Sequence, residues 1–154
     1  MDLRLMKDSG VIERMKRLVS RDLFPASLGI EFVDGGLGRA VVQLAVSERH
    51  LNCNGSCHGG VIFALADTAF GLASNSHGLL AAGIDAHITY HVAGKLNDVL
   101  TATATEVSRN RKLGVYRMDV TRADGVLVAS FTGTAYISSR QNDDGGEISS
   151  PASH

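Results

Sequence analysis

The sequence predicts an α+β fold in which one antiparallel sheet wraps around one long helix. Residues 57–75 are apolar on nearly every helical face and hold a single charged side chain, Asp67, a pattern typical of a buried helix. After this segment, apolar and polar side chains alternate with a period of two, which predicts strands. Two further strand-like segments precede the helix, so we expect the sheet to enclose it.

Before the buried helix, the chain changes pattern several times. Apolar side chains first recur at helical spacing: Val11, Met15, Leu18 and Val19. They predict an amphipathic helix within residues 1–20, which we expect Pro25 to interrupt. Two strands follow at 28–34 and 39–46, joined by a glycine-rich turn that favours a hairpin. Residues 47–56 are polar and are expected to be irregular.

After the buried helix, Asn75 and Gly78 are expected to end the helical segment. The alternation then predicts four strands, at 80–92, 100–108, 114–122 and 126–137. In the first of them, one face is expected to carry Ile84, Ala86, Ile88 and Tyr90. We therefore expect one domain over 1–154, with an N-terminal helix (1–20), a core (21–138) and a flexible tail (139–154) that is rich in Ser, Gly, Asp and Pro.

Composition excludes several classes of function. The chain has 154 residues, a net charge of −1 and a pI near 6.6, which argues against a protein that binds nucleic acid by neutralising phosphates. The sequence contains no run of 18 apolar residues, so no membrane span is expected. The N-terminal segment lacks the apolar stretch of a secretory signal. With two cysteines, Cys53 and Cys57, the expected location is the cytoplasm, where thiols stay reduced.

Asp67 is the main candidate for chemistry. A carboxylate on an apolar helix is costly unless it is paired, hydrogen-bonded or used. His58, Gly59 and Gly60 stand at the start of the same helix, where free N–H groups and a partial positive charge suit an oxyanion. The segment predicts an acyl-transfer site, with an acid that attacks or activates water. The alternative is a structural Asp67 stabilised by the helix dipole, although it lies two turns from the helix start.

Spacing argues that this site needs two chains. Gly59 and Asp67 are eight residues apart, so their Cα atoms should be about 12 Å apart on one helix. A nucleophile and an oxyanion donor acting on one carbonyl should be only about 6–7 Å apart. Two antiparallel helices related by a two-fold axis would bring Asp67 of one chain to Gly59 of the other and create two equal sites.

Each neighbouring residue also has a structural interpretation. The two glycines permit a tight entry into the helix. His58, considered alone, is expected to be a structural histidine with satisfied hydrogen bonds. Asn52 is typical of a loop residue that bonds its own backbone. The densest basic cluster lies at an expected hairpin turn and consists of Arg109, Arg111 and Lys112. Such a cluster is usually a solvated turn, and the functional alternative is a contact with phosphates.

Two other motifs are not supported by the sequence around them. Residues 55–59 fit the pattern G-x-C-x-G of a nucleophile elbow, but that elbow follows a strand directly, and here a loop precedes it. His50, Cys53, Cys57 and His58 suggest a zinc site, but their spacing matches no common ligand pattern. We therefore expect no metal site.

Several segments together resemble a known family, the hotdog-fold acyl-CoA thioesterases of the phenylacetic acid degradation (PaaI) type: Asn52, Cys57–Gly60, Leu65–Phe70, Asn75–Gly78 and, in a later strand, Leu113–Tyr116. The resemblance covers about residues 25–138. It implies a hotdog fold, an active site between subunits, and a homotetramer built as a dimer of dimers. It also implies no metal or redox cofactor, because coenzyme A arrives as part of the substrate.

The resemblance also implies roles for residues. Asp67 would be the catalytic carboxylate, the Gly59 N–H would polarise the thioester carbonyl, and His58 and Asn52 would orient the loop, substrate or water. Substrate or coenzyme A would be bound by Gly60, Thr68, Arg109, Arg111 and Lys112. One departure concerns water: some relatives have a serine near Gly83, and Ala81, Ala82 and Gly83 carry no hydroxyl here.

More than one acyl group of the substrate is compatible with the sequence. The resemblance favours phenylacetyl or hydroxyphenylacetyl groups, with Phe63 and Phe70 and nearby alanines offering a flat apolar slot. Medium-chain fatty acyl-CoA is the alternative substrate. Two alternative functions on the same fold are a non-catalytic acyl-CoA-binding protein, which would not need Asp67, and an acyl-CoA hydratase, which would need an acid–base pair aimed at the α and β carbons.

Overall fold

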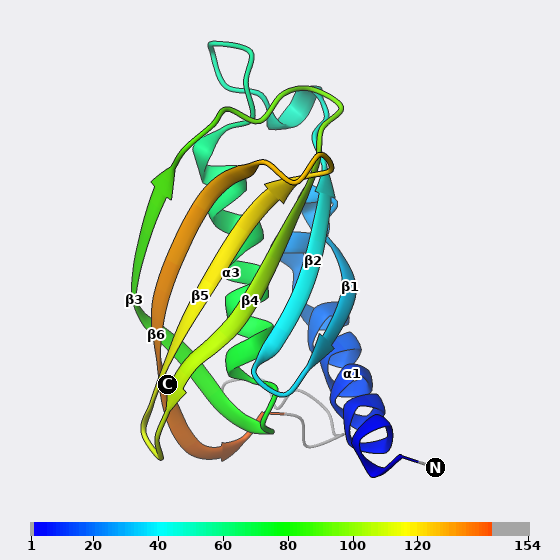
Figure 1. Cartoon of the computed structure of the whole chain (residues 1–154), viewed down its shortest axis with the longest axis vertical. Coiled ribbons are helices and arrows are strands. Elements are labelled where there is room, and N and C mark those ends of the chain that lie inside the picture. The colour runs from blue at the N-terminus through cyan, green and yellow to red at the C-terminus, as the bar shows by residue number, and fades with distance from the viewer. Residues whose placement is uncertain (1, 143–154) are drawn as a thin grey trace, which may run out of the picture.

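The computed structural model of the chain describes residues 2–142. Its elements, in chain order, are α1 (Leu3–Arg21), α2 (Leu23–Leu28), β1 (Glu31–Gly36), β2 (Arg39–Ala45), the short 3-10 helix η1 (Glu48–His50), α3 (Gly59–Ser74), β3 (Leu79–Tyr90), β4 (Val99–Arg109), β5 (Leu113–Arg122) and β6 (Leu127–Gln141). The predicted α+β class, with one antiparallel sheet curved around a long central helix, α3, is confirmed (Figure 1).

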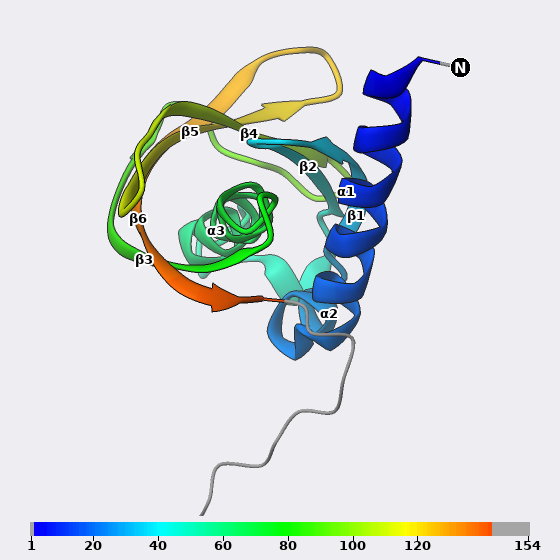
Figure 2. The same cartoon turned by 90° about the horizontal axis from the view of Figure 1, so that it is seen from below.

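The six strands form one sheet in the order β1-β2-β4-β5-β6-β3, with every neighbouring pair antiparallel. The sheet curves around α3, and α1 and α2 lie beside the helix on the side that the sheet leaves open (Figure 2). Fully buried side chains from the helix and strands fill the space between them, including Leu44, Leu65, Leu100, Tyr116 and Phe131. This packing fixes the position of α3, which carries the candidate site.

The structure corrects the prediction for the segment after α1. Pro25 does not interrupt regular structure but lies inside α2, where it is buried. Proline is tolerated in the first turn of a helix because the N–H it lacks has no intrahelical partner there. Gly29, with φ of 81°, ends α2 in the left-handed conformation. The first strand therefore begins at Glu31 and not at 28, and the expected irregular segment 47–56 contains η1.

The strand β3 also departs from its predicted pattern. Its register with β6 shifts between Gly83 and Asp85, so Ile84 has no pairing partner and is 61 % exposed. Ala86, Ile88 and Tyr90 keep the predicted common face, opposite Gly133, Phe131 and Ala129 of β6. A bulge of this kind inserts one extra residue and breaks the alternation, which makes the prediction wrong at Ile84.

At its other end, the sheet extends further than expected. The strand β6 continues to Gln141, which pairs with Leu79 of β3, so the first residues of the predicted tail belong to the sheet. The rest of that tail, residues 143–154, lies outside the described residues. Within residues 2–142, no helix combines the length and the apolar character needed to cross a membrane.

Candidate active site

Within residues 2–142, one face of α3 is left uncovered. Gly60, Asp67 and Gly71 are exposed, and their spacings of seven and four residues place them on one side of the helix. The other sides are buried through Ile62, Ala64, Leu65, Ala66, Ala69, Phe70, Leu72, Ala73 and Ser74. The expectation that the sheet buries this helix on all sides is therefore wrong for the single chain, because the sheet curves around only part of it.

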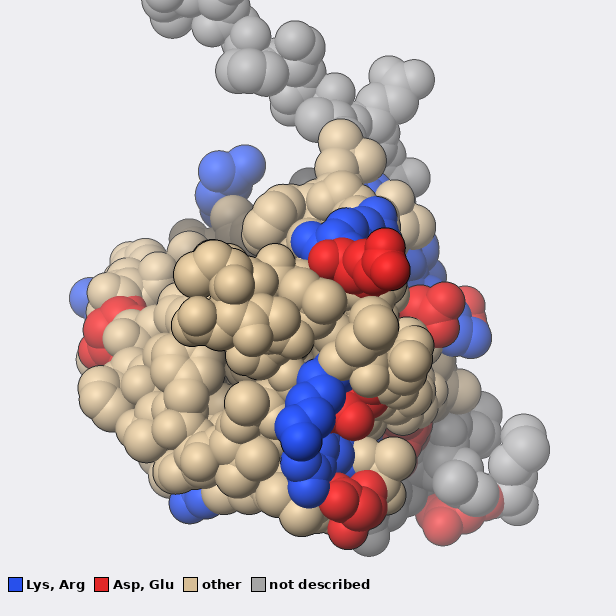
Figure 3. All heavy atoms as spheres, turned by 90° about the horizontal axis from the view of Figure 1, so that it is seen from above, with Lys and Arg blue, Asp and Glu red and all other residues tan. Residues whose placement is uncertain are grey.

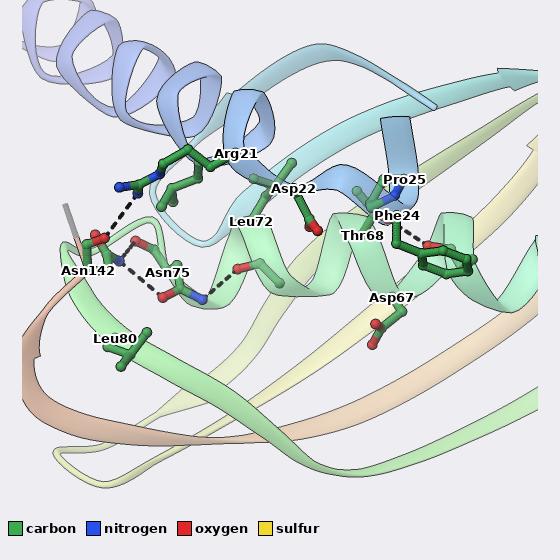
Figure 4. A pocket seen from close by; sticks show the side chains of 13 residues that line it. Arg21, Asp22, Phe24, Pro25, Asp67, Thr68, Leu72, Asn75, Leu80 and Asn142 are labelled. Carbon is green, nitrogen blue, oxygen red and sulfur yellow. Dashed lines mark hydrogen bonds between the residues drawn. The ribbon is translucent and has the colours of Figure 1, made fainter. Parts of the chain in front are cut away.

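Asp67 opens into a cavity of about 410 Å³ between α3, the α1–α2 junction and the start of β3. Figure 4 shows its carboxylate extending away from the axis of α3. No described residue donates a hydrogen bond or forms an ion pair with it. Although the side chain reaches solvent, the surrounding protein raises the pKa of Asp67, first by desolvation and second by Coulomb repulsion from Asp22. An unpaired carboxylate with a raised pKa is a stronger base than an ordinary surface aspartate.

Asp22 is a member of this site that sequence reasoning missed. It occupies the N-cap position of α2, yet its side chain makes no capping hydrogen bond. Instead it lines the same cavity as Asp67 (Figure 4). An aspartate ahead of an apolar segment is an ordinary signal for a helix start, so nothing local in the sequence connects it with a residue 45 positions later.

The first turn of α3 is held by His58. Its ring Nδ1 accepts a hydrogen bond of 2.8 Å from the Gly60 N–H, and its C=O accepts the N–H groups of Val61 and Ile62 at 2.9 and 3.3 Å. His58 is thus the N-cap of the helix, as its structural interpretation predicts. Among the described residues, the Gly59 N–H has no acceptor. This leaves one amide at the helix start free for a ligand.

Tyr90 is a second residue that sequence reasoning missed. Its hydroxyl donates a 2.8 Å hydrogen bond to the Gly59 C=O. The sequence signal for this orientation toward α3 is the row of apolar residues that share its face of β3. A Cβ on Gly59 would lie 3.1 Å from the tyrosine Cζ and Oη atoms. The glycine therefore permits a close approach between β3 and the start of the helix.

Asn52 orders the loop ahead of α3. Its side-chain Oδ1 accepts the N–H groups of Asn54 and Ser56 at 2.9 and 3.1 Å, which is the local bonding that its structural interpretation predicts. Together with Gly59 and Tyr90 it lines a separate cavity of about 300 Å³. Within one chain, Gly59 and Asp67 thus line two different cavities.

The remaining predicted ligand residues are distributed over the molecule. Thr68 lines the Asp67 cavity, but its hydroxyl donates to the Ala64 C=O at 2.7 Å. The basic cluster forms the predicted turn between β4 and β5, at the opposite end of the sheet from Gly59 (Figure 1). There, Arg109 lies 3.9 Å from Glu106, while Arg111 and Lys112 are exposed. Most of the surface seen from the end where α3 begins is uncharged (Figure 3).

Phe70 accounts for the missing hydroxyl near Gly83, and the burial of Cys57 argues against a nucleophile elbow at residues 55–59. A Cβ on Gly83 would lie 2.8 Å from Phe70 Cε1, so the aromatic ring fills the space that a serine side chain would need. Cys57 is buried, and desolvation, followed by the charge of Asp98, raises its pKa to about 11, which makes the thiol a poor nucleophile. In residues 2–142 no group of three or more His, Cys, Asp or Glu is arranged to hold a metal ion.

Comparisons with known proteins identify the family of the chain. Residues 54–129 match the family model described as the thioesterase superfamily. A putative esterase from Archaeoglobus fulgidus is 40 % identical over 139 residues, which cover 90 % of this chain and 88 % of the relative. The acyl-coenzyme A thioesterase PaaI of Escherichia coli is 37 % identical over 119 residues, covering 77 % and 85 % of the two chains.

Solved structures lead to the same family. The structure of E. coli PaaI superposes with a TM-score of 0.85 at 32 % identity and covers 88 % of this chain and 98 % of that one. A hypothetical thioesterase from Streptococcus pneumoniae, solved with coenzyme A, superposes with a TM-score of 0.75 at 31 % identity, covering 82 % and 98 %. The chain therefore belongs to the thioesterase superfamily, as a thioester hydrolase of the PaaI-type hotdog branch.

Proposed function

We propose that the protein hydrolyses acyl-CoA thioesters, converting acyl-S-CoA and water into a free carboxylic acid and the CoA thiol. The observation that carries this proposal is the Asp67 carboxylate, which has no hydrogen-bond or ion-pair partner within residues 2–142, has a raised pKa and opens into a cavity with apolar side chains among its walls. The E. coli and S. pneumoniae relatives support coenzyme A as the thiol portion. No metal or redox cofactor is needed, because a carboxylate and a peptide N–H suffice for acyl transfer.

The complete site would be built from two chains. Gly59 and Asp67 line different cavities of one chain, and the 1.5 Å rise per residue separates their Cα atoms by about 12 Å. The strand β3 lies at a sheet edge, runs for 12 residues and is mostly exposed, so its free N–H and C=O groups favour pairing with another strand. Antiparallel pairing of two β3 strands would place the two α3 helices antiparallel, with Asp67 near the partner's Gly59.

In this arrangement the Gly59 N–H would bind the thioester oxygen, where the positive end of the helix dipole favours an oxyanion. Asp67 has two possible roles. As a nucleophile it attacks the carbonyl carbon, expels CoA thiolate and forms a mixed anhydride, which water then hydrolyses. As a general base it takes a proton from water, whose oxygen attacks the carbonyl before the C–S bond breaks. Single-turnover hydrolysis in ¹⁸O-water separates them, because label enters Asp67 only through the anhydride.

For the substrate, we propose phenylacetyl or hydroxyphenylacetyl groups, with medium-chain fatty acyl groups as the alternative. The apolar side chains around the Asp67 cavity support both. Arg109, Arg111 and Lys112 would contact the phosphates of coenzyme A, since the antiparallel dimer brings the β4–β5 end of one chain toward the α3 N-terminus of its partner. A homotetramer built from two such dimers, located in the cytoplasm, remains our expectation.

The test is release of free thiol from acetyl-, octanoyl-, phenylacetyl- and hydroxyphenylacetyl-CoA, comparing the wild-type chain with Asp67→Asn. Asparagine keeps the shape of the side chain but neither attacks nor accepts a proton, so we expect kcat to fall by about 10²- to 10⁴-fold. Asp119→Asn on β5, where the half-buried carboxylate pairs with Arg117 at 3.1 Å, is the matched control and should keep wild-type activity. Near-wild-type turnover by Asp67→Asn would remove Asp67 from the mechanism. Tight acyl-CoA binding without any thiol release would instead favour the non-catalytic function.

A further inference from the structure

The short helix α2 exposes two large apolar side chains next to the candidate site. Leu23 is 80 % exposed and Phe24 65 % exposed, while Pro25 is the buried residue of this helix. Leaving a phenylalanine in water forgoes much of the free energy that its burial would supply. An exposed aromatic side chain is common on a surface, but Phe24 also lines the cavity that contains Asp67. Its partner should therefore be something that enters this cavity.

The cavity has apolar walls along its length, with Asp22 between them and polar groups at its far end (Figure 4). Its apolar walls come from four elements: Leu18 of α1, Phe24 and Pro25 of α2, Ala64 and Leu72 of α3, and Leu80 of β3. Figure 4 places Phe24 and Asp67 at one end of the cavity. At the other end, Arg21 donates to the Asn142 C=O at 3.3 Å, and Asn142 Nδ2 donates to the Asn75 C=O at 2.7 Å. The end of the cavity far from Asp67 is thus lined by polar groups that are hydrogen-bonded to one another.

The chemistry of the site decides what fits there. A thioester carbonyl close to Asp67 must have an acyl group on one side and the CoA sulfur on the other. The wall next to Asp67 offers few free donors, because the Thr68 hydroxyl is already bonded to the Ala64 C=O. Asp22 adds a second negative charge to the same cavity, which disfavours an acyl group that ends in a carboxylate. An uncharged apolar acyl group matches these walls, whereas the polyanionic CoA portion does not.

The backbone of α2 around Phe24 is held by hydrogen bonds. Pro25 is buried, and its C=O accepts the Ile30 N–H at 3.0 Å. The Ser27 hydroxyl donates to the Phe24 C=O at 2.6 Å, and Arg49 donates to the Ser27 C=O at 2.8 Å. The side chain is thus presented by a helix that is anchored on both sides. Leu23, one residue earlier, is not part of the cavity wall.

We propose that α2 forms the acyl-selecting wall of the active site, with Phe24 in contact with the aryl or alkyl group of the substrate. This inference rests on the proposed function, since it assumes that the carbonyl lies at Asp67. It assigns specificity to the α1–α2 junction, a segment outside residues 54–129 that match the family model. Phe24 acts by covering the acyl group and takes no part in bond making or breaking.

The experiment compares Phe24→Ala with Leu23→Ala on acetyl-, phenylacetyl- and octanoyl-CoA. An acetyl group is too short to need the wall, so its kcat/KM is the internal reference. For Phe24→Ala we expect the ratio of kcat/KM for phenylacetyl-CoA to that for acetyl-CoA to fall about 10- to 100-fold, because several apolar contacts are lost in the transition state. Leu23→Ala loses a similar apolar side chain outside the cavity and should leave this ratio unchanged.

Three results would overturn the proposal. They are an unchanged ratio in Phe24→Ala, an equal loss in Leu23→Ala, and a change in oligomeric state of Phe24→Ala by sedimentation, which would make Phe24 a subunit contact. A binding measurement separates this proposal from the proposed function. If Asp67→Asn binds phenylacetyl-CoA more tightly than CoA, and Asp67→Asn/Phe24→Ala loses that difference, the wall is supported whether or not the wild-type chain hydrolyses the ester. If the two variants bind phenylacetyl-CoA with equal affinity, the proposal is contradicted.

Discussion

The first turn of α3 and the turn that carries Asp67 differ in how the chain holds them. Around Gly59, the His58 cap, the Tyr90 hydroxyl and the bonded loop of Asn52 fix the backbone through hydrogen bonds of 2.7 to 3.1 Å. Around Asp67, no described group forms a hydrogen bond or ion pair with the carboxylate, and the adjacent Asp22 repels it. One chain therefore fixes the helix start, which is the donor end of the proposed site, and leaves Asp67, its acid end, without a bonded partner among the described residues.

This difference fits a site divided between subunits. A donor that must receive developing charge works best when it is fixed in advance, and this requires only its own chain. A carboxylate that must reach a carbonyl bound by the partner has to remain unpaired until substrate and partner are present. Substitutions at the two ends of the proposed site test this division.

Gly59→Pro removes the N–H at the helix start, and its Cβ would lie 3.1 Å from the Tyr90 ring. Gly59→Ala makes the same contact with Tyr90 but keeps the N–H, so it is the matched control. Proline is favoured at the first helical position, and His58 has φ of −59° and ψ of 134°, which suits a residue before proline. The N–H is lost, so we expect kcat to fall about 10²- to 10³-fold, with circular dichroism and thermal unfolding showing a folded protein. A folded Gly59→Pro variant with wild-type turnover would show that this amide does not hold the oxyanion.

Mixing two inactive variants tests whether the site crosses between chains. In a dimer of one Gly59→Pro chain and one Asp67→Asn chain, one of the two sites would have both native residues. After unfolding and refolding an equal mixture, half of the dimers should be mixed, so we expect recovery of about a quarter of wild-type activity. If Gly59 and Asp67 acted within one chain, the mixture would stay as inactive as its components.

His58→Ala tests how much the cap contributes to the donor end. The ring no longer accepts the Gly60 N–H, so we expect the free energy of unfolding to fall by about 0.5–2 kcal/mol, measured by urea denaturation. His58→Asn should recover most of this loss, because asparagine is among the best N-cap residues. If kcat of His58→Ala falls by more than its lost stability explains, and His58→Asn restores stability but not kcat, the imidazole takes part in the chemistry as well.

Asp22→Asn tests the acid end and should have the smallest effect at neutral pH. The pKa of Asp67 is raised by desolvation and then by the charge of Asp22. Removing that charge lowers this pKa, so the carboxylate stays ionised to lower pH and the acidic limb of the kcat/KM profile moves to lower pH. Asparagine keeps the N-cap preference of the position. Asp124→Asn, which removes an exposed charge elsewhere, should leave the profile unchanged. An unmoved limb in Asp22→Asn means that desolvation alone sets the pKa.

Local patterns were sufficient to predict much of the fold. The apolar segment before Asn75 gave the central helix, and the alternation after it gave four strands within a few residues of their observed bounds. These predictions succeed because periodicity and helix capping depend on neighbours that are close in sequence. The motif around His58, Gly59 and Asp67 was also enough to identify the family, which the comparisons confirm. The catalytic roles of these residues stay predictions.

Only the tertiary structure decided which surfaces of those elements meet. The sequence did not show that Pro25 would be buried inside a helix, that Ile84 would form a bulge, or that the Asp67 side of α3 would stay uncovered. Asp22 and Phe24 join the site because α2 packs against α3, whose Asp67 lies more than 40 residues later in the chain than either of them. Contacts of this kind depend on the sum of packing over the whole sheet, which overrides local propensity. The residues that surround Asp67 therefore had to come from the fold.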